Sequence, residues 1–381
     1  MNDGQALRST APIAVVPAPV LPYRPRLPHS YRPRIGVIGC GGITAHHLAA
    51  YRQDELDVVA LCARRPEQAE ARRAEFYPAA TVYADHHLLL KRADIDVVDI
   101  ALPPGPRAAV IADALRAGKH VLSQKPFVLD LDEGERLVAL AAAQRRLLAV
   151  NQNGRWAPYA AYARQAVAAG LLGDIDSVTM TLAWDHTWIR GTAFERERQL
   201  ILLDFAIHWL DLARCFMPGA IPRQVTATTA RANGQDVRPD LLAHIGITCD
   251  RGLATLAFNG HARSGGSDER LVIQGSAGMI TATGDVCAAN DLRLTMMSGG
   301  VASRSAPVLD GAWFDDGFRG AMGELLCAIE DGRQPGNSAA DNLATLALAF
   351  AAAASADRGG VPVAVGSVRR PSALHHETAN D

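Results

Sequence analysis

The feature that most constrains this chain is a glycine-rich turn between a short apolar strand and a helix. Residues 35–44 read Ile-Gly-Val-Ile-Gly-Cys-Gly-Gly-Ile-Thr. Gly39 permits a tight turn, Gly41 lets the backbone approach a pyrophosphate, and the helix that follows offers free N–H groups. The pattern predicts a dinucleotide site formed by Gly39, Gly41, Gly42 and Ile43. The alternative is a tight turn in a Rossmann-like domain that binds nothing.

Strand-like and helix-like segments alternate from residue 34 to about residue 152. Strands are expected over 34–39, 57–63, around Val82, and over 97–101, 120–123 and 148–151. Helices are expected between them over 43–52, 67–76, 85–92, 107–117 and 131–144. Alternation at this spacing is typical of a parallel, doubly wound sheet, so residues 34–152 are predicted to form a Rossmann domain.

The pattern changes after Asn153, where several strands follow one another without helices between them. Strands are expected over 175–184, 224–229, 241–248, 253–259, 270–274 and 279–283, and helices over 159–169, 203–216, 317–331 and 339–356. Residues 153–367 therefore read as an α+β domain with a large, mostly antiparallel open sheet. Residues 1–33, with seven prolines, are expected to form a flexible arm, and residues 368–381 a flexible tail.

Composition excludes several classes of partner. A length of 381 residues suits two domains, and a net charge of −2 gives no field that would attract nucleic acid or an anionic membrane. The six cysteines form no CxxC or CxxH pair, which argues against a zinc site and suits a reducing cytoplasm. No uninterrupted apolar run approaches the roughly 20 residues of a transmembrane helix. We expect a cytoplasmic protein without a metal.

The end of the second strand bears on the choice of cofactor. Dinucleotide folds that bind NAD place an acid there to hold the adenosine ribose hydroxyls. This chain has Arg64 and Arg65 instead, and a guanidinium can receive a 2′-phosphate in a planar, charge-assisted contact. The sequence predicts NADP(H) in preference to NAD(H). The alternative is that both arginines are solvated loop charges.

Four motifs in this order and spacing resemble those of the Gfo/Idh/MocA family, which includes glucose–fructose oxidoreductase and inositol dehydrogenase. They are the glycine turn, the run 117–126 that is similar to the family's "aGKHVl-EKP", the run 151–158, and the Asp204…His208…Asp211 helix. The resemblance covers roughly residues 34–367. Two departures stand out, because Gln124 replaces the usual Glu before Lys125 and Arg107 replaces a common His.

Three residues are candidates for catalysis. Lys125 follows the fifth strand, at the sheet edge where ligands of open α/β folds bind, and the resemblance implies that it orients the substrate. Asp204 and His208 are four residues apart and are expected to share one helix face, where His208 could take a hydroxyl proton. No third ligand accompanies them, so a metal is not expected. The alternatives are a turn-capping lysine and a core histidine.

The remaining site candidates follow from position and resemblance. Leu102, Pro103, Gln124 and Lys125 are assigned to the cofactor. The candidates for substrate binding are Asn153, Arg155, Trp184 and Asp185. The ring of Trp184 could stack on a sugar or could be a core aromatic. Asp211 could orient His208 or could stabilise the structure.

The expected activity is hydride transfer between a nicotinamide and a secondary alcohol or ketone of a sugar, polyol or related cyclic substrate. A nicotinamide-assisted glycoside hydrolase or lyase and a non-catalytic cofactor-binding regulator remain alternatives. The resemblance also implies a homodimer or homotetramer, with the proline-rich arm wrapping a neighbouring subunit.

Overall fold

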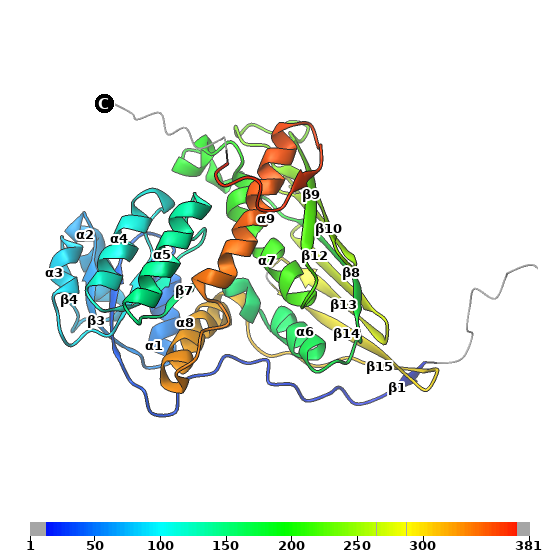
Figure 1. Ribbon diagram of the computed structural model, residues 1–381, viewed down its shortest axis with the longest axis horizontal. Helices are drawn as coiled ribbons and strands as arrows, with labels where there is room; N and C mark the ends of the chain where they lie inside the picture. The colour runs from blue at the N-terminus through cyan, green and yellow to red at the C-terminus, as the bar shows by residue number, and fades with distance from the viewer. Residues whose placement is uncertain (1–12, 264, 287, 372–381) are drawn as a thin grey trace, which may run out of the picture.

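The computed structural model describes residues 13–263, 265–286 and 288–371, which form two β-sheets with helices between and around them (Figure 1). The smaller sheet has six strands and the larger has ten. This is the predicted fold class, a Rossmann-like parallel sheet followed by an α+β unit with a large sheet.

The smaller sheet is entirely parallel and has the strand order β4-β3-β2-β5-β6-β7. Its central strands are buried along almost their whole length, as expected of a sheet covered on both faces. The elements are β2 (Arg34–Ile38), α1 (Thr44–Gln53), β3 (Asp57–Cys62), α2 (Pro66–Phe76), β4 (Thr81–Tyr83), α3 (His86–Leu90), β5 (Val97–Ile100), α4 (Pro104–Arg116), β6 (His120–Ser123), α5 (Leu131–Ala143) and β7 (Leu148–Val150).

The larger sheet has the order β1-β15-β14-β13-β12-β8-β11-β10-β9-β16 and is antiparallel except at β8–β11 and β1–β15. Its strands are β1 (Ala14–Val15), β8 (Ile175–Ala183), β9 (Pro222–Ala230), β10 (Leu242–Cys249), β11 (Leu253–Asn259), β12 (Asp268–Gly275), β13 (Gly278–Asp285), β14 (Ala288–Ser298), β15 (Val301–Ser305) and β16 (Val363–Ala364). The sequence analysis missed β14 and β15, because polar residues interrupt the alternation there: only Ala289, Leu292 and Leu294 of β14 are buried core residues.

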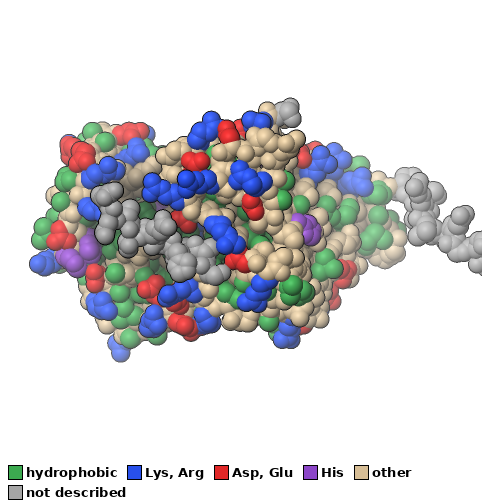
Figure 2. Space-filling model, turned by 90° about the horizontal axis from the view of Figure 1, so that it is seen from above, with side chains coloured by type: hydrophobic (Ala, Val, Ile, Leu, Met, Phe, Trp, Pro, Cys, Tyr) green, Lys and Arg blue, Asp and Glu red, His purple; other side chains and the backbone are tan. Residues whose placement is uncertain are grey.

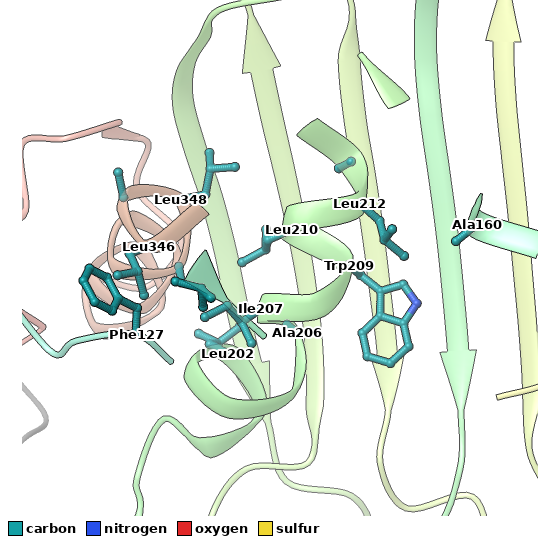
Figure 3. Packing of buried hydrophobic residues seen from close by; sticks show 14 of the residues in the cluster. Phe127, Ala160, Leu202, Ala206, Ile207, Trp209, Leu210, Leu212, Leu346 and Leu348 are labelled. Atoms are coloured by element: carbon teal, nitrogen blue, oxygen red, sulfur yellow. The ribbon is translucent and has the colours of Figure 1, made fainter. Parts of the chain in front are cut away.

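Three helices cover one face of the large sheet: α6 (Pro158–Ala168), α7 (Ile207–Phe216) and α9 (Ala339–Asp357) (Figure 1). Trp209 points from α7 toward the sheet, while Leu346 and Leu348 of α9 lie near Phe127 of the first domain (Figure 3). Helix α9 is long and apolar enough to cross a membrane, but 72% of its most apolar stretch is buried inside the protein. Its burial is that of a core helix.

Helix α8 (Trp313–Asp331) lies at the junction of the two domains, although it follows the last strands of the large sheet. It packs against α1 and against a 3₁₀ turn, η1 (Asn153–Trp156), which follows β7. Phe318 of α8 is completely buried and lies 4.5 Å, ring to ring, from His47 of α1. One helix therefore supports both the cofactor-binding end of the Rossmann domain and the start of the second domain.

Residues 13–33 of the predicted arm run in an extended path along both domains and contact them (Figure 1). Val16 N donates to Arg304 O, and Tyr162 Oη donates to Pro19 O at 2.9 Å. The arm thus forms hydrogen bonds with β15 and with α6 of the same chain. Residues 1–12 and 372–381 lie outside the described residues. At the start of the expected tail, Arg369 pairs with Asp132 and Glu135 of α5, and Arg370 pairs with Asp130, the residue before α5.

Glu330 of α8 anchors the end of the arm. Its carboxylate accepts backbone N–H groups from His29, Ser30 and Tyr31 at 2.7–2.9 Å. These bonds lower the pKa of Glu330 to about 2, so the anchor is complete above the ordinary carboxyl pKa and weakens as the pH falls toward 2.

We expect Glu330→Ala to release residues 28–31. Amides 29–31 should exchange hydrogen faster, and trypsin should cut faster at the arginines of the arm, because three N–H groups lose their acceptor. Glu67→Ala, on the exposed surface of α2, is the control and should change neither rate. Unchanged exchange at residues 29–31 in Glu330→Ala would contradict the anchoring role.

The face seen in Figure 2 carries basic and acidic side chains intermixed, in keeping with the net charge of −2.

Candidate active site

The glycine turn lies between β2 and α1, as the sequence predicts. Gly39 has a φ of +101°, and a Cβ there would lie 2.6 Å from Ala101 O, so only glycine fits. By contrast, a Cβ on Gly41 or Gly42 would meet nothing within 4 Å. Helix α1 has no side-chain cap after Ile43 and no acid in its first turn. Open space next to an uncapped helix N-terminus fits a pyrophosphate.

Thr44 takes the position that many dinucleotide folds give to a third glycine. Its hydroxyl is completely buried and donates to Gly39 O at 2.8 Å. The side chain thus closes the turn from within, away from the open face of Gly41 and Gly42. The departure from the glycine pattern therefore leaves the pyrophosphate side of the turn clear.

The two arginines predicted to choose the cofactor follow β3, next to the glycine turn. Arg64 and Arg65 are exposed, and neither has a salt-bridge partner among the described residues. Arg72, which the sequence analysis did not select, donates from α2 to Gly41 O at 3.3 Å. Cationic groups therefore surround the position where the adenosine half of a dinucleotide would lie in this fold.

Lys125 follows β6 and reaches from the first domain to the second. Its Nζ donates to the Asp204 carboxylate at 3.0 Å and to the Asp204 carbonyl at 2.7 Å. Gln124 Oε1 accepts the Lys125 backbone N–H at 2.8 Å, which gives Gln124 a local structural role. The structure thus brings two of the three predicted catalytic residues into direct contact.

Arg107 holds the backbone on both sides of Lys125. Its guanidinium donates to Gln124 O and Pro126 O, and also to Leu102 O in the loop after β5. Burial lowers the pKa of Arg107 to about 9, an effect that the Asp204 carboxylate opposes. Arg107, in the place of a common family histidine, therefore ties the loop of Leu102 and Pro103 to the loop of Lys125.

The helix expected over 203–216 is interrupted. Residues Ile201–Phe205 form a π-helical turn, and α7 begins only at Ile207. Asp204 therefore lies in the π-turn and His208 in α7, and the single regular helix expected from the sequence is not formed. π-turns of this kind re-aim individual side chains and are common at functional sites.

His208 is almost fully buried and lies close enough to Lys125 for that charge to act on its ring. Burial, with a further contribution from the positive charge of Lys125, lowers the pKa of His208 well below its usual range. Its Nδ1 is buried and has no hydrogen-bond partner in the part of the chain that the structure describes. The ring of His208 is therefore neutral at neutral pH.

Arg155 is not placed to bind a substrate. Its side chain is 4% exposed and forms a bidentate pair with Asp211, with both N···O distances 2.6 Å. The same guanidinium contacts Asp341 at 2.6 Å and Gly336 O at 2.6 Å. This network also answers the question left open for Asp211, which pairs with Arg155 and does not orient His208.

The other three substrate candidates have different surroundings. Trp184 is buried and stacks on Phe205 with 3.8 Å between the ring centres, so it is a core aromatic and not a ring that stacks on a sugar. Asp185 is exposed and accepts Thr187 N at 2.9 Å. Asn153 is buried, and its Oδ1 accepts the indole N–H of Trp313, which packs edge-on against His208. The substrate roles of Asp185 and Asn153 remain predictions.

The sequence analysis also missed His186. The ring is buried and lies 5.3 Å, ring to ring, from Phe205, the residue after Asp204. A histidine two residues after a strand tryptophan carries no recognisable motif, so only the fold could reveal it.

Together, these residues form an ammonium–carboxylate pair beside a neutral imidazole, at the carboxyl end of a parallel sheet with a glycine turn. A neutral imidazole can accept a proton, and an ammonium group can stabilise negative charge on an oxygen. Such a set can remove a proton from an alcohol or return it to a ketone.

Comparisons with known proteins find relatives for both domains. The NAD-binding Rossmann domain of the GFO/IDH/MocA oxidoreductase family matches residues 33–152, and the GFO/IDH/MocA C-terminal domain matches residues 160–281. The chain is 28% identical to a D-apiose dehydrogenase of Paraburkholderia graminis over 85% of this chain and 87% of the relative. It is also 28% identical to an inositol 2-dehydrogenase of Rhizobium meliloti, over 84% of this chain and 96% of the relative.

A solved oxidoreductase from Agrobacterium radiobacter, in complex with NAD+, L-tartaric acid and magnesium, has the same fold. It superposes with a TM-score of 0.76 at 22% identity, over 88% of this chain and 99% of the other.

Proposed function

Because the chain belongs to the GFO/IDH/MocA family of oxidoreductases, we propose that it transfers hydride between a nicotinamide cofactor and a secondary alcohol of a sugar or polyol. The observation that carries the proposal is the contact of Lys125 with Asp204 beside the neutral His208. The relatives named as apiose and inositol dehydrogenases act on small polyhydroxy compounds, which agrees with this substrate class.

Cofactor binding, proton transfer and charge stabilisation fall to different residues. The glycine turn and the N-terminus of α1 would hold the pyrophosphate of the cofactor. His208 accepts the hydroxyl proton as oxidation proceeds, and Lys125 donates a hydrogen bond to the same oxygen and stabilises its developing negative charge. Asp204 orients Lys125. When bound, a nicotinamide cofactor would supply the hydride-transfer chemistry.

The test is a panel of sugars and polyols offered to the enzyme with NADP+ or NAD+, followed by absorbance of the reduced cofactor. We expect at least one compound to drive reduction, and a ketone to form in equal amount. Bond cleavage without net cofactor reduction would favour the hydrolase or lyase alternative. A cofactor-loaded protein inert toward the whole panel would favour a regulatory role.

We expect NADP(H) to bind more tightly than NAD(H), because Arg64 and Arg65 are exposed at the end of β3, where an acid would favour NAD. Arg64→Ser with Arg65→Ser should weaken NADP(H) binding about 10- to 100-fold, with little change for NAD(H), as measured by calorimetric titration. Arg116→Ser, at an exposed ion pair of α4, is the control. Equal affinities of the unaltered protein for both cofactors would contradict the preference.

The cytoplasmic location and the homodimeric or homotetrameric state also stay predictions. Along β10, β11 and β12, buried residues alternate with more exposed ones, so the two faces of the large sheet differ in burial. The more exposed face is not covered by the helices of Figure 1. This is the face through which we propose that copies associate.

A further inference from the structure

The protonation state of His186 is fixed by its neighbours. Nδ1 lies 2.8 Å from Trp184 Nε1 and 3.2 Å from Trp188 Nε1. An indole N–H can only donate, so Nδ1 must accept and carries no proton. A neutral His186 therefore holds its proton on Nε2, and the two tryptophans lock this tautomer.

The Nε2–H group lies on the other side of the ring from these two indoles. Nε2 is buried without a hydrogen bond among the described residues. Burial lowers the pKa of His186 to about 4, while the charges of Asp204 and Lys125 act on it in opposite directions. The ring therefore stays neutral over the ordinary pH range, as a permanent hydrogen-bond donor near the catalytic pair. A buried donor without an acceptor is costly, and in an enzyme a ligand can supply the missing acceptor.

The ring is also held in place. The His186 backbone N–H donates to Gly260 O at 2.8 Å, and Asp185 forms a β-bridge with His261. The imidazole packs 5.3 Å, ring to ring, from both Phe205 and Trp184. Phe205 directly follows Asp204, so the same π-turn supports the catalytic carboxylate and His186.

We infer that His186 determines substrate specificity by donating a hydrogen bond from Nε2 to an oxygen next to the alcohol that reacts. The inference rests on the proposed function. Asp204, when ionised, can only accept hydrogen bonds, whereas His186 Nε2 can only donate. A hydroxyl group can do both at once, so this pair of neighbours selects a substrate with a second hydroxyl beside the reacting one. A substrate without that oxygen leaves the donor unpaired and is rejected.

The tautomer can be tested without a substrate. The full-length protein, labelled with ¹⁵N-histidine, should show one neutral ring protonated on Nε2 between pH 6 and pH 8 that is absent from the spectrum of His186→Gln. A spectrum in which this ring carries its proton on Nδ1 would overturn the inference while leaving the proposed function intact.

The specificity can be tested with the polyol that the panel shows to be turned over best and with its mono-deoxy analogues. In the unaltered enzyme, one analogue that lacks a neighbouring hydroxyl should lose about 10-fold in kcat/KM. His186→Phe should lose a similar factor with the parent polyol, mainly through KM, and should not discriminate against that analogue. His186→Gln, which keeps an N–H donor at a similar reach, should recover part of the loss.

If His186→Phe kept the parent KM and still rejected the same analogue, His186 would not be the donor. If His186→Phe failed to fold, His186→Gln and the analogue series with the unaltered enzyme would still decide the question. Absence of turnover for every polyol would instead count against the proposed function and, with it, against this role.

Discussion

Replacing Lys125 by methionine is expected to lower kcat about 10²- to 10⁴-fold while leaving cofactor affinity within a few-fold. Methionine keeps the length of the side chain but has no ammonium group. The substrate oxygen then loses the donor that stabilises its negative charge, and Asp204 loses the cation that it contacts at 3.0 Å. The measurement is steady-state turnover together with titration of the reduced cofactor.

The sequence supplies a matched control, because the chain has only three lysines. Lys91→Met removes an exposed lysine at the end of α3 and should keep full turnover. Lys119 is a poor control because its Nζ donates to the backbone carbonyls of Arg92 and Ile95. If Lys125→Met turned over at the rate of Lys91→Met, the assignment of the site would be wrong.

Replacing Arg155 by methionine is expected to reduce the free energy of unfolding by about 3–5 kcal/mol. The change removes the bidentate guanidinium from Asp211, whose side chain is 1% exposed. Among the described residues, this buried carboxylate then keeps the hydroxyl of Thr345 and the more distant guanidinium of Arg214. The network also joins η1 to α7 and α9, so the loss should appear as one cooperative shift in urea denaturation.

A double variant separates this explanation from simple loss of packing. Arg155→Met with Asp211→Leu removes both charges and should recover most of the stability. Arg270→Met, at an exposed pair with Asp268, is the surface control and should cost less than about 1 kcal/mol. A stability loss in Arg155→Met no larger than in this control would contradict the buried network.

The sequence predicts the parts of this protein that depend on local patterns. Alternating strands and helices, and glycines at a strand–helix junction, follow from backbone geometry over a few residues, so the parallel sheet and the cofactor turn were predictable. Lys125 was predictable because parallel strands end at the same edge of a sheet. Family motifs added His208 and Asp204.

Contacts between distant segments were not predictable. Arg155 looks like a substrate ligand until Asp211 and Asp341, far along the chain, are placed beside it. The π-turn depends on a register that differs from an α-helix by one residue, and no periodicity in 203–216 reveals it. His186 becomes significant only when two indoles meet one nitrogen, an arrangement that requires the folded strand end.

The position of α8 restricts how a substrate can enter. This helix packs on α1, just behind the glycine turn, and on η1, where Gly154 lies against His208. A hinge motion that separated the two domains would have to strip Phe318 from its completely buried position. We therefore expect access to depend on movement of surface loops, such as the short 3₁₀ turns between β8 and Leu200, over a rigid two-domain frame.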